Sequence, residues 1–188
     1  ELCVFRDFTQ LRNWGLVWDE DTTVGVVFHE AWHQYADRYW PDVTLHRWFD
    51  EGLAEVFGSW RKKGNAWRTN YHVNRHEAME SLIRMDSLIN ADKIIGWPRS
   101  KFYGGGATDY YAQAWVMVDF LMRGEEKLGS QNWDPSWSKI LENYGEACLK
   151  LKGNEPEKAA KAAIEGIDIE KFEAAWRNWY NTGMVKKG

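Results

Sequence analysis

Two histidines and a glutamate form an H-E-x-x-H pattern, at His29, Glu30 and His33. On a helix, residues four apart lie one above the other on the same face, so both imidazoles can bind one zinc ion. The glutamate lies at the edge of such a site, where it can accept a proton from a water molecule that the metal activates. The pattern therefore predicts two zinc ligands and a general base.

Apolar residues around this pattern indicate which face of the helix should pack against the protein core. At about 100° per residue they form one stripe, whose centre lies roughly 160° from the two histidines. The stripe consists of Val24, Val27, Phe28, Ala31 and Tyr35. We expect this stripe to be buried, which leaves the histidines without a packing role and favours the metal interpretation.

A second predicted helix, over residues 46–61, offers a third ligand. Catalytic zinc commonly takes three protein ligands, and two histidines with one glutamate is a recurring set. Glu51 and Glu55 lie one turn apart, opposite an apolar arc. Pro41 and Asp42 interrupt the chain between the two helices, so the second can fold back antiparallel and bring Glu51 to the histidines. On their own, two such glutamates are more often a solvated helix face.

Together, residues 29–33 and 48–55 resemble the gluzincin metallopeptidases, the group of thermolysin and aminopeptidase N. The closest resemblance is to bacterial peptidase-like domains with a W-[LF]-x-E-G-L-A-E signature, and the seventeen residues that separate His33 from Glu51 are within the range that this group uses. The resemblance implies three zinc ligands, a general base and a carboxylate that orients a ligand histidine, which we expect to be His29. The implied zinc ligands are His29, His33 and Glu51. The implied general base is Glu30, and the orienting carboxylate is Glu55.

The resemblance also implies the fold class, which is α+β and predominantly helical: a zincin-like metallopeptidase domain with a small N-terminal sheet. Short strands are expected at Leu2–Phe5 and near Leu16–Trp18. In this group a sheet normally precedes the metal helix, and its edge strand pairs with an extended peptide substrate. About twenty residues precede the helix here, so we expect either a reduced sheet or a further N-terminal region.

A tyrosine is the candidate that stabilises the oxyanion of the reaction. Residues 108–115 resemble a Y-A-Q-[AS]-W segment of the bacterial domains, which aligns Tyr111 with that role and leaves Tyr110 as the alternative. Thr108 or Asp109 is the expected N-cap of this helix. Tyr111 also belongs to an apolar helical stripe, so its ring can be buried while its hydroxyl reaches the site.

Another pair of histidines, His72 and His76, also lies four residues apart. Neither has an adjacent acidic motif, so we interpret them as loop or rim residues rather than ligands. A histidine of this segment is the alternative to Tyr111 as the oxyanion donor.

Further helices are predicted from apolar periodicity, separated by glycine-rich and polar segments. Their expected ranges are 23–39, 73–86, 89–95, 137–144, 156–164 and 169–180, with a polar loop around Gly64 and Asn65.

The composition suits one domain over residues 1–188. A net charge of −4 argues against nucleic-acid binding, and no apolar run is long enough to cross a membrane. Cys3 and Cys148 match no metal-binding spacing, and could pair or remain thiols. Because the chain begins with Glu1, we expect it to be part of a longer precursor, and we expect an extracytoplasmic location.

Two functions are consistent with these observations. The first is a zinc-dependent peptidase that binds one Zn²⁺ and acts on a peptide or protein substrate. The second is a zincin-fold binding or scaffolding domain with little or no activity, which recognises a protein or glycan through surfaces rich in the 13 tryptophans. The presence of Glu30 favours the first, since a scaffold has no use for a general base.

Overall fold

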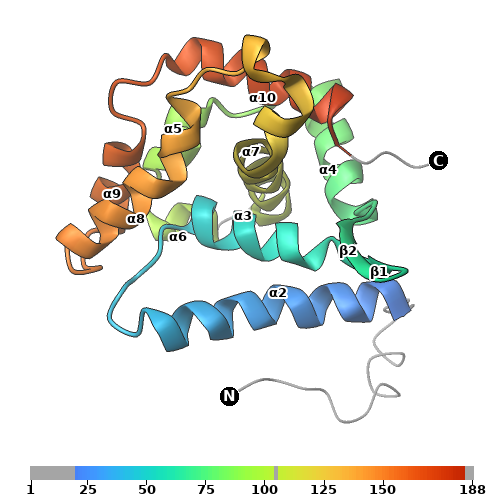
Figure 1. Cartoon of the computed structure of the whole chain (residues 1–188). Helices are drawn as coiled ribbons and strands as arrows, with labels where there is room; N and C mark the ends of the chain where they lie inside the picture. The colour runs from blue at the N-terminus through green and yellow to red at the C-terminus, as the bar shows by residue number, and fades with distance from the viewer. Residues whose placement is uncertain (1–19, 104–105, 185–188) are drawn as a thin grey trace.

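The computed structural model describes residues 20–103 and 106–184, which are mostly helical with one small antiparallel sheet (Figure 1). In chain order the elements are α2 (Glu20–Tyr39), α3 (Arg47–Gly58), β1 (Trp60–Lys63), β2 (Ala66–Thr69), α4 (Val73–Arg84), α5 (Ala91–Gly96), α6 (Arg99–Phe102), α7 (Ala107–Leu128), α8 (Ile140–Lys150), α9 (Pro156–Ala163) and α10 (Ile169–Thr182). Two short 3₁₀-helices, η1 (Ser130–Asn132) and η2 (Trp137–Lys139), connect α7 to α8.

The central helix is α7, and α3, α4 and α10 pack around it (Figure 1). Every residue from Ala112 to Leu121 is buried, as expected of a helix that is apolar on nearly all sides. The only carboxylate in this stretch, Asp119, accepts two hydrogen bonds from Arg123 and one from Trp179 Nε1. The charge is therefore paired where solvent cannot reach it.

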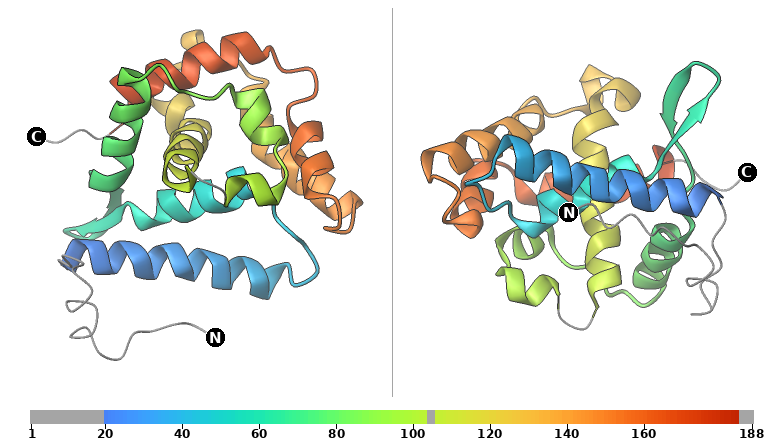
Figure 2. Two further views of the ribbon diagram at one scale, coloured as in Figure 1. Left: turned by 180° about the vertical axis from the view of Figure 1, so that it is seen from behind. Right: turned by 90° about the horizontal axis from the view of Figure 1, so that it is seen from below.

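The outermost helix is α2, which runs antiparallel to α3 and lies across it (Figures 1 and 2). The two helices approach closely at a pair of glycines, where a Cβ on Gly25 would lie 2.8 Å from the Gly58 carbonyl oxygen. Further along, the ring of Trp32 stacks on Phe57 with a centroid distance of 5.6 Å. This contact fixes which face of α2 is turned toward α3.

That face is not the one that the apolar pattern predicts. Trp32 and Ala36 are buried, and the two histidines of the motif lie half-buried against α3. The predicted stripe is largely exposed, with Val27 at 50% and Tyr35 at 48% exposure. The predicted buried face of α2 was wrong because a glycine contact, aromatic stacking and polar pairs hold this helix against α3. The spacing of apolar residues along the sequence does not reveal such contacts.

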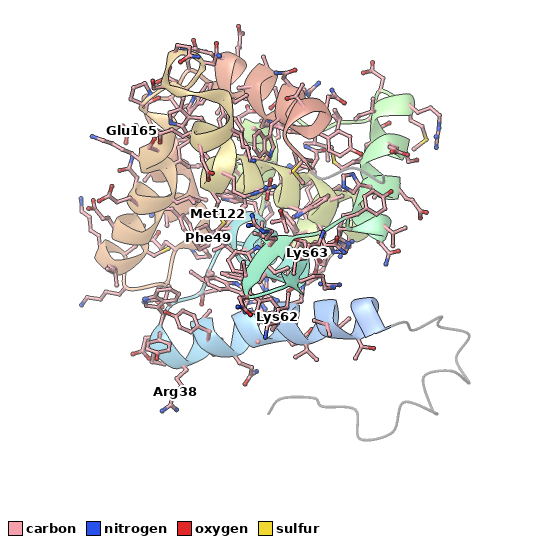
Figure 3. The ribbon with its side chains drawn as sticks, turned by 45° about the vertical axis from the view of Figure 1, so that its right-hand side comes forward. Arg38, Phe49, Lys62, Lys63, Met122 and Glu165 are labelled. Atoms are coloured by element: carbon pink, nitrogen blue, oxygen red, sulfur yellow. The ribbon has the colours of Figure 1, made fainter. Side chains whose placement is uncertain are left out.

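The sheet of the described region follows α3, at a point where the sequence suggested only a polar loop. β1 and β2 pair antiparallel with Trp60 opposite Thr69, and the hairpin carries Lys62 and Lys63 (Figure 3). The signal was present in the sequence, because Gly64–Asn65 is a two-residue connection typical of a β-hairpin. Gly64 has a φ of +63°, which glycine adopts without strain.

Two other expectations fall on residues outside the described region. The predicted strands at Leu2–Phe5 and Leu16–Trp18 both belong to residues 1–19. Cys3 lies there too, so its pairing with Cys148, which is buried on α8, has no structural account.

Most of the other predicted helices are present, with ends that differ by a few residues. The expected caps Thr108 and Asp109 are wrong, since α7 begins at Ala107 and its N-cap is Gly106, with a φ of +101° that favours glycine. Within residues 20–103 and 106–184, no helix combines the length and the apolarity needed to cross a membrane.

The tryptophans of the described region are mostly core residues. The buried ones are Trp32, Trp48, Trp115, Trp133, Trp137, Trp176 and Trp179. Trp67 and Trp40 are exposed, at 50% and 36%. The described residues therefore present no extended tryptophan-rich surface.

Candidate metal centre

Three side chains of α2 and α3 bring one ligand atom each to a common point. His29 Nε2 lies 3.3 Å from His33 Nε2, and each of these nitrogens lies 3.5 Å from Glu51 Oε2. The two histidines follow one another on the inner face of α2, and Glu51 is buried on the facing side of α3. Among the described residues, these three form the group whose geometry could hold a metal ion.

The spacing of these atoms matches a tetrahedral metal site. Zinc binds nitrogen and oxygen ligands at about 2.0–2.1 Å, so two ligands of a tetrahedral site lie roughly 3.3–3.4 Å apart. The three observed distances, 3.3, 3.5 and 3.5 Å, are close to that value. One ion could therefore sit between the three atoms and keep a fourth position for water or substrate.

Each histidine also contacts a carboxylate through its other ring nitrogen. Glu55 Oε1 lies 3.3 Å from His29 Nδ1, the histidine for which the sequence suggested this contact. On the other side, Asp50 Oδ1 lies 3.0 Å from His33 Nδ1. A carboxylate in this position fixes the tautomer that leaves Nε2 free for a metal, and it makes that nitrogen a better ligand.

Both supporting carboxylates are themselves held in place. Glu55 accepts hydrogen bonds from Arg75, at 2.5 Å, and from His72 Nε2, at 2.9 Å. Its side chain is 3% exposed, so these partners compensate for nearly complete burial.

Asp50 is held in a similar way, by an aromatic donor and a cation. It accepts hydrogen bonds from Trp32 Nε1, at 3.1 Å, and from Arg47, at 2.8 Å. The same guanidinium group donates to Glu51 Oε1 at 3.1 Å. Arg47 thus links the candidate ligand to the carboxylate that supports His33.

The charge balance of the centre favours a divalent cation. Three carboxylates (Asp50, Glu51 and Glu55) pair with two guanidinium groups (Arg47 and Arg75), and Glu30 lines the adjoining cavity, which leaves two negative charges when the histidines are neutral. One divalent ion would neutralise this excess.

The same excess of negative charge raises the pKa values of the two histidines. Burial alone would lower the pKa of His29, but hydrogen bonds to Glu51 and Glu55 outweigh it and raise the pKa to about 9. Burial opposes protonation of His33 too, yet its contacts with Asp50 and Glu51 raise the pKa to about 10. Without a metal, protons on the two rings supply the positive charge that the centre lacks.

The glutamates shift in the opposite direction. Burial would raise the pKa of Glu51, but hydrogen bonds from the two histidines lower it to about 2. Burial of Glu55 is likewise outweighed by bonds from His29, His72 and Arg75, which hold its pKa well below the usual range. Both groups are therefore carboxylates at neutral pH, as a metal ligand and its supporting acceptor must be.

The candidate base and oxyanion donor border a cavity beside the three candidate ligands. Glu30 is exposed and lines a cavity of about 1320 Å³ together with the three ligands and Tyr111. Burial, the charge of Glu51 and a hydrogen bond to it raise the pKa of Tyr111, so the phenol stays protonated and can donate. Tyr110 points elsewhere and packs on Trp97, at a centroid distance of 4.9 Å.

Several residues at the centre were not singled out from the sequence. Asp50 and Arg47 could have been, because they stand one and four positions before Glu51 on the same helix, and four positions is one helical turn. Tyr103 had no such signal: its hydroxyl lies 3.4 Å from Glu51 Oε1, but it reaches the centre from the end of α6.

The second histidine pair divides between two environments. His72 borders a cavity near the centre and binds Glu55, as described above. His76 is 1% exposed and packs between Trp115 and Tyr180, so the interpretation of His76 as a loop or rim residue was wrong.

We compared the chain with protein-family models, with curated proteins and with solved structures, and found no match in any of the three. Assignment of a function therefore rests on the residues and their geometry.

Proposed function

We propose that this chain is a zinc-dependent peptidase of the gluzincin type, with a zincin-like arrangement of the metal and glutamate helices. The observation that carries the proposal is the convergence of His29 Nε2, His33 Nε2 and Glu51 Oε2 at 3.3–3.5 Å. Each histidine has a carboxylate on its remaining nitrogen, an arrangement common at zinc sites.

Zinc is favoured over iron by the spacing of the ligand atoms. Two histidines and a carboxylate also hold iron in oxygenases, where the geometry is octahedral. At metal–ligand distances near 2.1 Å, neighbouring ligands of an octahedral site lie about 3.0 Å apart. The observed separations are nearer the tetrahedral value. Glu30, a carboxylate outside the ligand set, also suits hydrolysis better than oxygen chemistry.

The roles of the protein side chains in hydrolysis follow from their positions. When bound, zinc would lower the pKa of a water molecule and polarise the carbonyl group of the substrate. Glu30 would accept the proton of the attacking water and pass it to the amine nitrogen as the C–N bond breaks. Tyr111 would donate a hydrogen bond to the oxyanion that forms at the carbonyl.

The alternative, a binding domain without activity, has less support. It requires exposed tryptophans, and within the described region only Trp67 and Trp40 are exposed. It also leaves the position of Glu30 unexplained. This acidic side chain lines the cavity beside the candidate ligands but supports neither histidine.

The substitution Glu30→Gln tests this proposal. We expect it to reduce peptide hydrolysis at least about a hundredfold, the usual contribution of a general base, with the zinc content unchanged. Glu77→Gln removes an exposed carboxylate of α4 and serves as the matched control, which should retain full activity. Wild-type activity in the Glu30→Gln protein would exclude the proposed mechanism.

A further inference from the structure

The metal centre lies at the junction of two cavities. The larger one, about 1320 Å³, extends toward the segment after α2 and toward α6. A second cavity of about 480 Å³ extends toward the end of α3 and the start of α4. Both are lined by the same three residues, His29, Glu30 and Tyr111. The centre is therefore open to cavity space on two sides.

Helix α2 forms one wall of both cavities. Within α2, the smaller cavity is bordered by Gly25 and Val26, and the larger one continues past His33 to Asp37. Gly25 and Asp37 are twelve positions apart, or about 18 Å along a helix axis. At about 3.3 Å per residue, this length accommodates roughly five residues of extended peptide.

The opposite wall is assembled from elements that lie along the same side of α2. The right-hand view of Figure 2 shows α4, α6 and the first turns of α7 on one side of α2, with the β1–β2 hairpin on the other. Tyr111, on α7, lines both cavities, whereas α4 lines only the smaller cavity and α6 only the larger one. The two cavities thus follow one another in the direction of the α2 axis.

The guanidinium groups that border the centre are already hydrogen-bonded within the protein, including Arg61 of the smaller cavity, which donates to the carbonyl oxygens of Gly58 and Trp60. Arg47 is bound to Asp50 and Glu51, and Arg75 is bound to Glu55. The other charged residues that line the larger cavity, Arg99 and Lys152 among them, are exposed. Removal of single terminal residues needs an anchor for the chain terminus or a closed end next to the reacting bond. In the described residues, Arg47 and Arg75 are engaged by the carboxylates of the centre, and cavity space continues on both sides of it.

We infer that the substrate is an internal stretch of an extended polypeptide, bound on both sides of the cleaved bond, so that the enzyme is an endopeptidase. This inference rests on the proposed function. The cleaved bond lies at Glu30 and Tyr111, with substrate residues on one side in the larger cavity and those on the other side in the smaller one.

The inference is tested with the zinc-loaded protein and a library of peptides about ten residues long, twice the estimated groove length. Each peptide is supplied with free termini and also with an acetylated N-terminus and an amidated C-terminus, and the products are identified by mass spectrometry. We expect internal cleavage of both forms at comparable kcat/KM. Release of single residues from the free peptides only would overturn the inference while leaving the peptidase function intact. Failure to cleave either form would contradict the peptidase function itself.

Three matched substitutions test the two-sided groove. Asn74 lines the smaller cavity, Asn154 lines the larger one, and Asn178, on α10, lines neither, and all three are exposed. We expect Asn74→Trp and Asn154→Trp each to lower kcat/KM on the blocked peptides about tenfold, since contacts remote from the bond contribute to its cleavage. Asn178→Trp should have no effect, and zinc content should be unchanged in all three. An effect of only one of the two cavity substitutions would contradict binding on both sides.

Discussion

Asp50 Oδ1 lies 3.0 Å from His33 Nδ1, and the next residue along α3, Glu51, contributes the oxygen that lies 3.5 Å from Nε2 of the same ring. Two neighbouring residues of one helix therefore contact opposite nitrogens of one histidine. This relationship ties the position of α3 to the orientation of a candidate ligand on α2.

Because of this contact, we expect Asp50 to influence metal affinity. The substitution Asp50→Asn removes the charge that favours the His33 tautomer with a free Nε2, so zinc affinity should fall roughly 10- to 100-fold. Competition with a chelator of known affinity measures the change. Asp92→Asn alters an exposed aspartate of α5 and should leave the affinity unchanged. Equal affinities for the two variants would mean that Asp50 plays no part in metal binding.

Tyr111→Phe removes the hydroxyl that we assign to the oxyanion. We expect kcat to fall about 10²- to 10³-fold with zinc content unchanged, the usual cost of losing one such donor. Tyr110→Phe is the neighbouring control, because its ring packs on Trp97. A large fall in kcat for Tyr103→Phe instead would transfer the role to Tyr103, whose hydroxyl lies 3.4 Å from Glu51 Oε1.

Zinc binding should release protons at neutral pH. In the metal-free protein the pKa values of His29 and His33 are raised to about 9 and about 10, so both rings carry a proton at pH 7.5. A ligand nitrogen must be unprotonated, so binding one ion should release about two protons, and apparent affinity should rise with pH until the rings lose their protons. Calorimetry in buffers of different ionisation enthalpy measures this number. A binding heat that is the same in every buffer would show that the rings are neutral beforehand.

The crossing of α3 and α7 should be intolerant of added volume at Gly52. A Cβ at this position would lie 2.6 Å from a methyl carbon of Val118 and 2.9 Å from the Ala114 carbonyl oxygen. We expect Gly52→Ala to lower the free energy of unfolding by about 1–3 kcal/mol, the typical cost of overpacking. Gly145→Ala, on α8 where a Cβ meets no neighbour within 4 Å, should raise it by up to about 1 kcal/mol. Denaturant unfolding compares the two, and equal stabilities would contradict the tight crossing.

The sequence identifies the three candidate ligands that the structure brings together, but it identifies the residues around them less completely. The H-E-x-x-H pattern identifies His29 and His33 as candidate ligands because their spacing follows directly from helix geometry, whereas Glu51 is assigned through the resemblance to the gluzincin signature. The contacts of Asp50 and Arg47 with the centre also follow from that geometry, but only once the facing side of α3 is known. Tyr103 and Arg75 come from other helices, and their approach depends on tertiary packing that no local pattern encodes.

The same distinction explains the error in the orientation of α2. Hydrophobic periodicity selected Val27 and Tyr35 as buried, whereas both are exposed. The contact between Gly25 and Gly58 and the stacking of Trp32 on Phe57 hold α2 against α3 by its polar face. A helix that contributes a functional centre to an interface can bury its polar residues there, because they are paired with partners on the facing helix.

The central claim is that His29, His33 and Glu51 bind one zinc ion, and metal analysis tests it most directly. The wild-type protein, equilibrated with zinc and then freed of loosely bound metal, should retain about one zinc per chain, the stoichiometry of a three-ligand catalytic site. Glu51→Ala should lose most of this zinc while keeping its helical circular dichroism, and Glu146→Ala, an exposed glutamate of α8, should retain it. A wild-type protein without zinc, or a Glu51→Ala protein with its normal zinc content, would contradict the account.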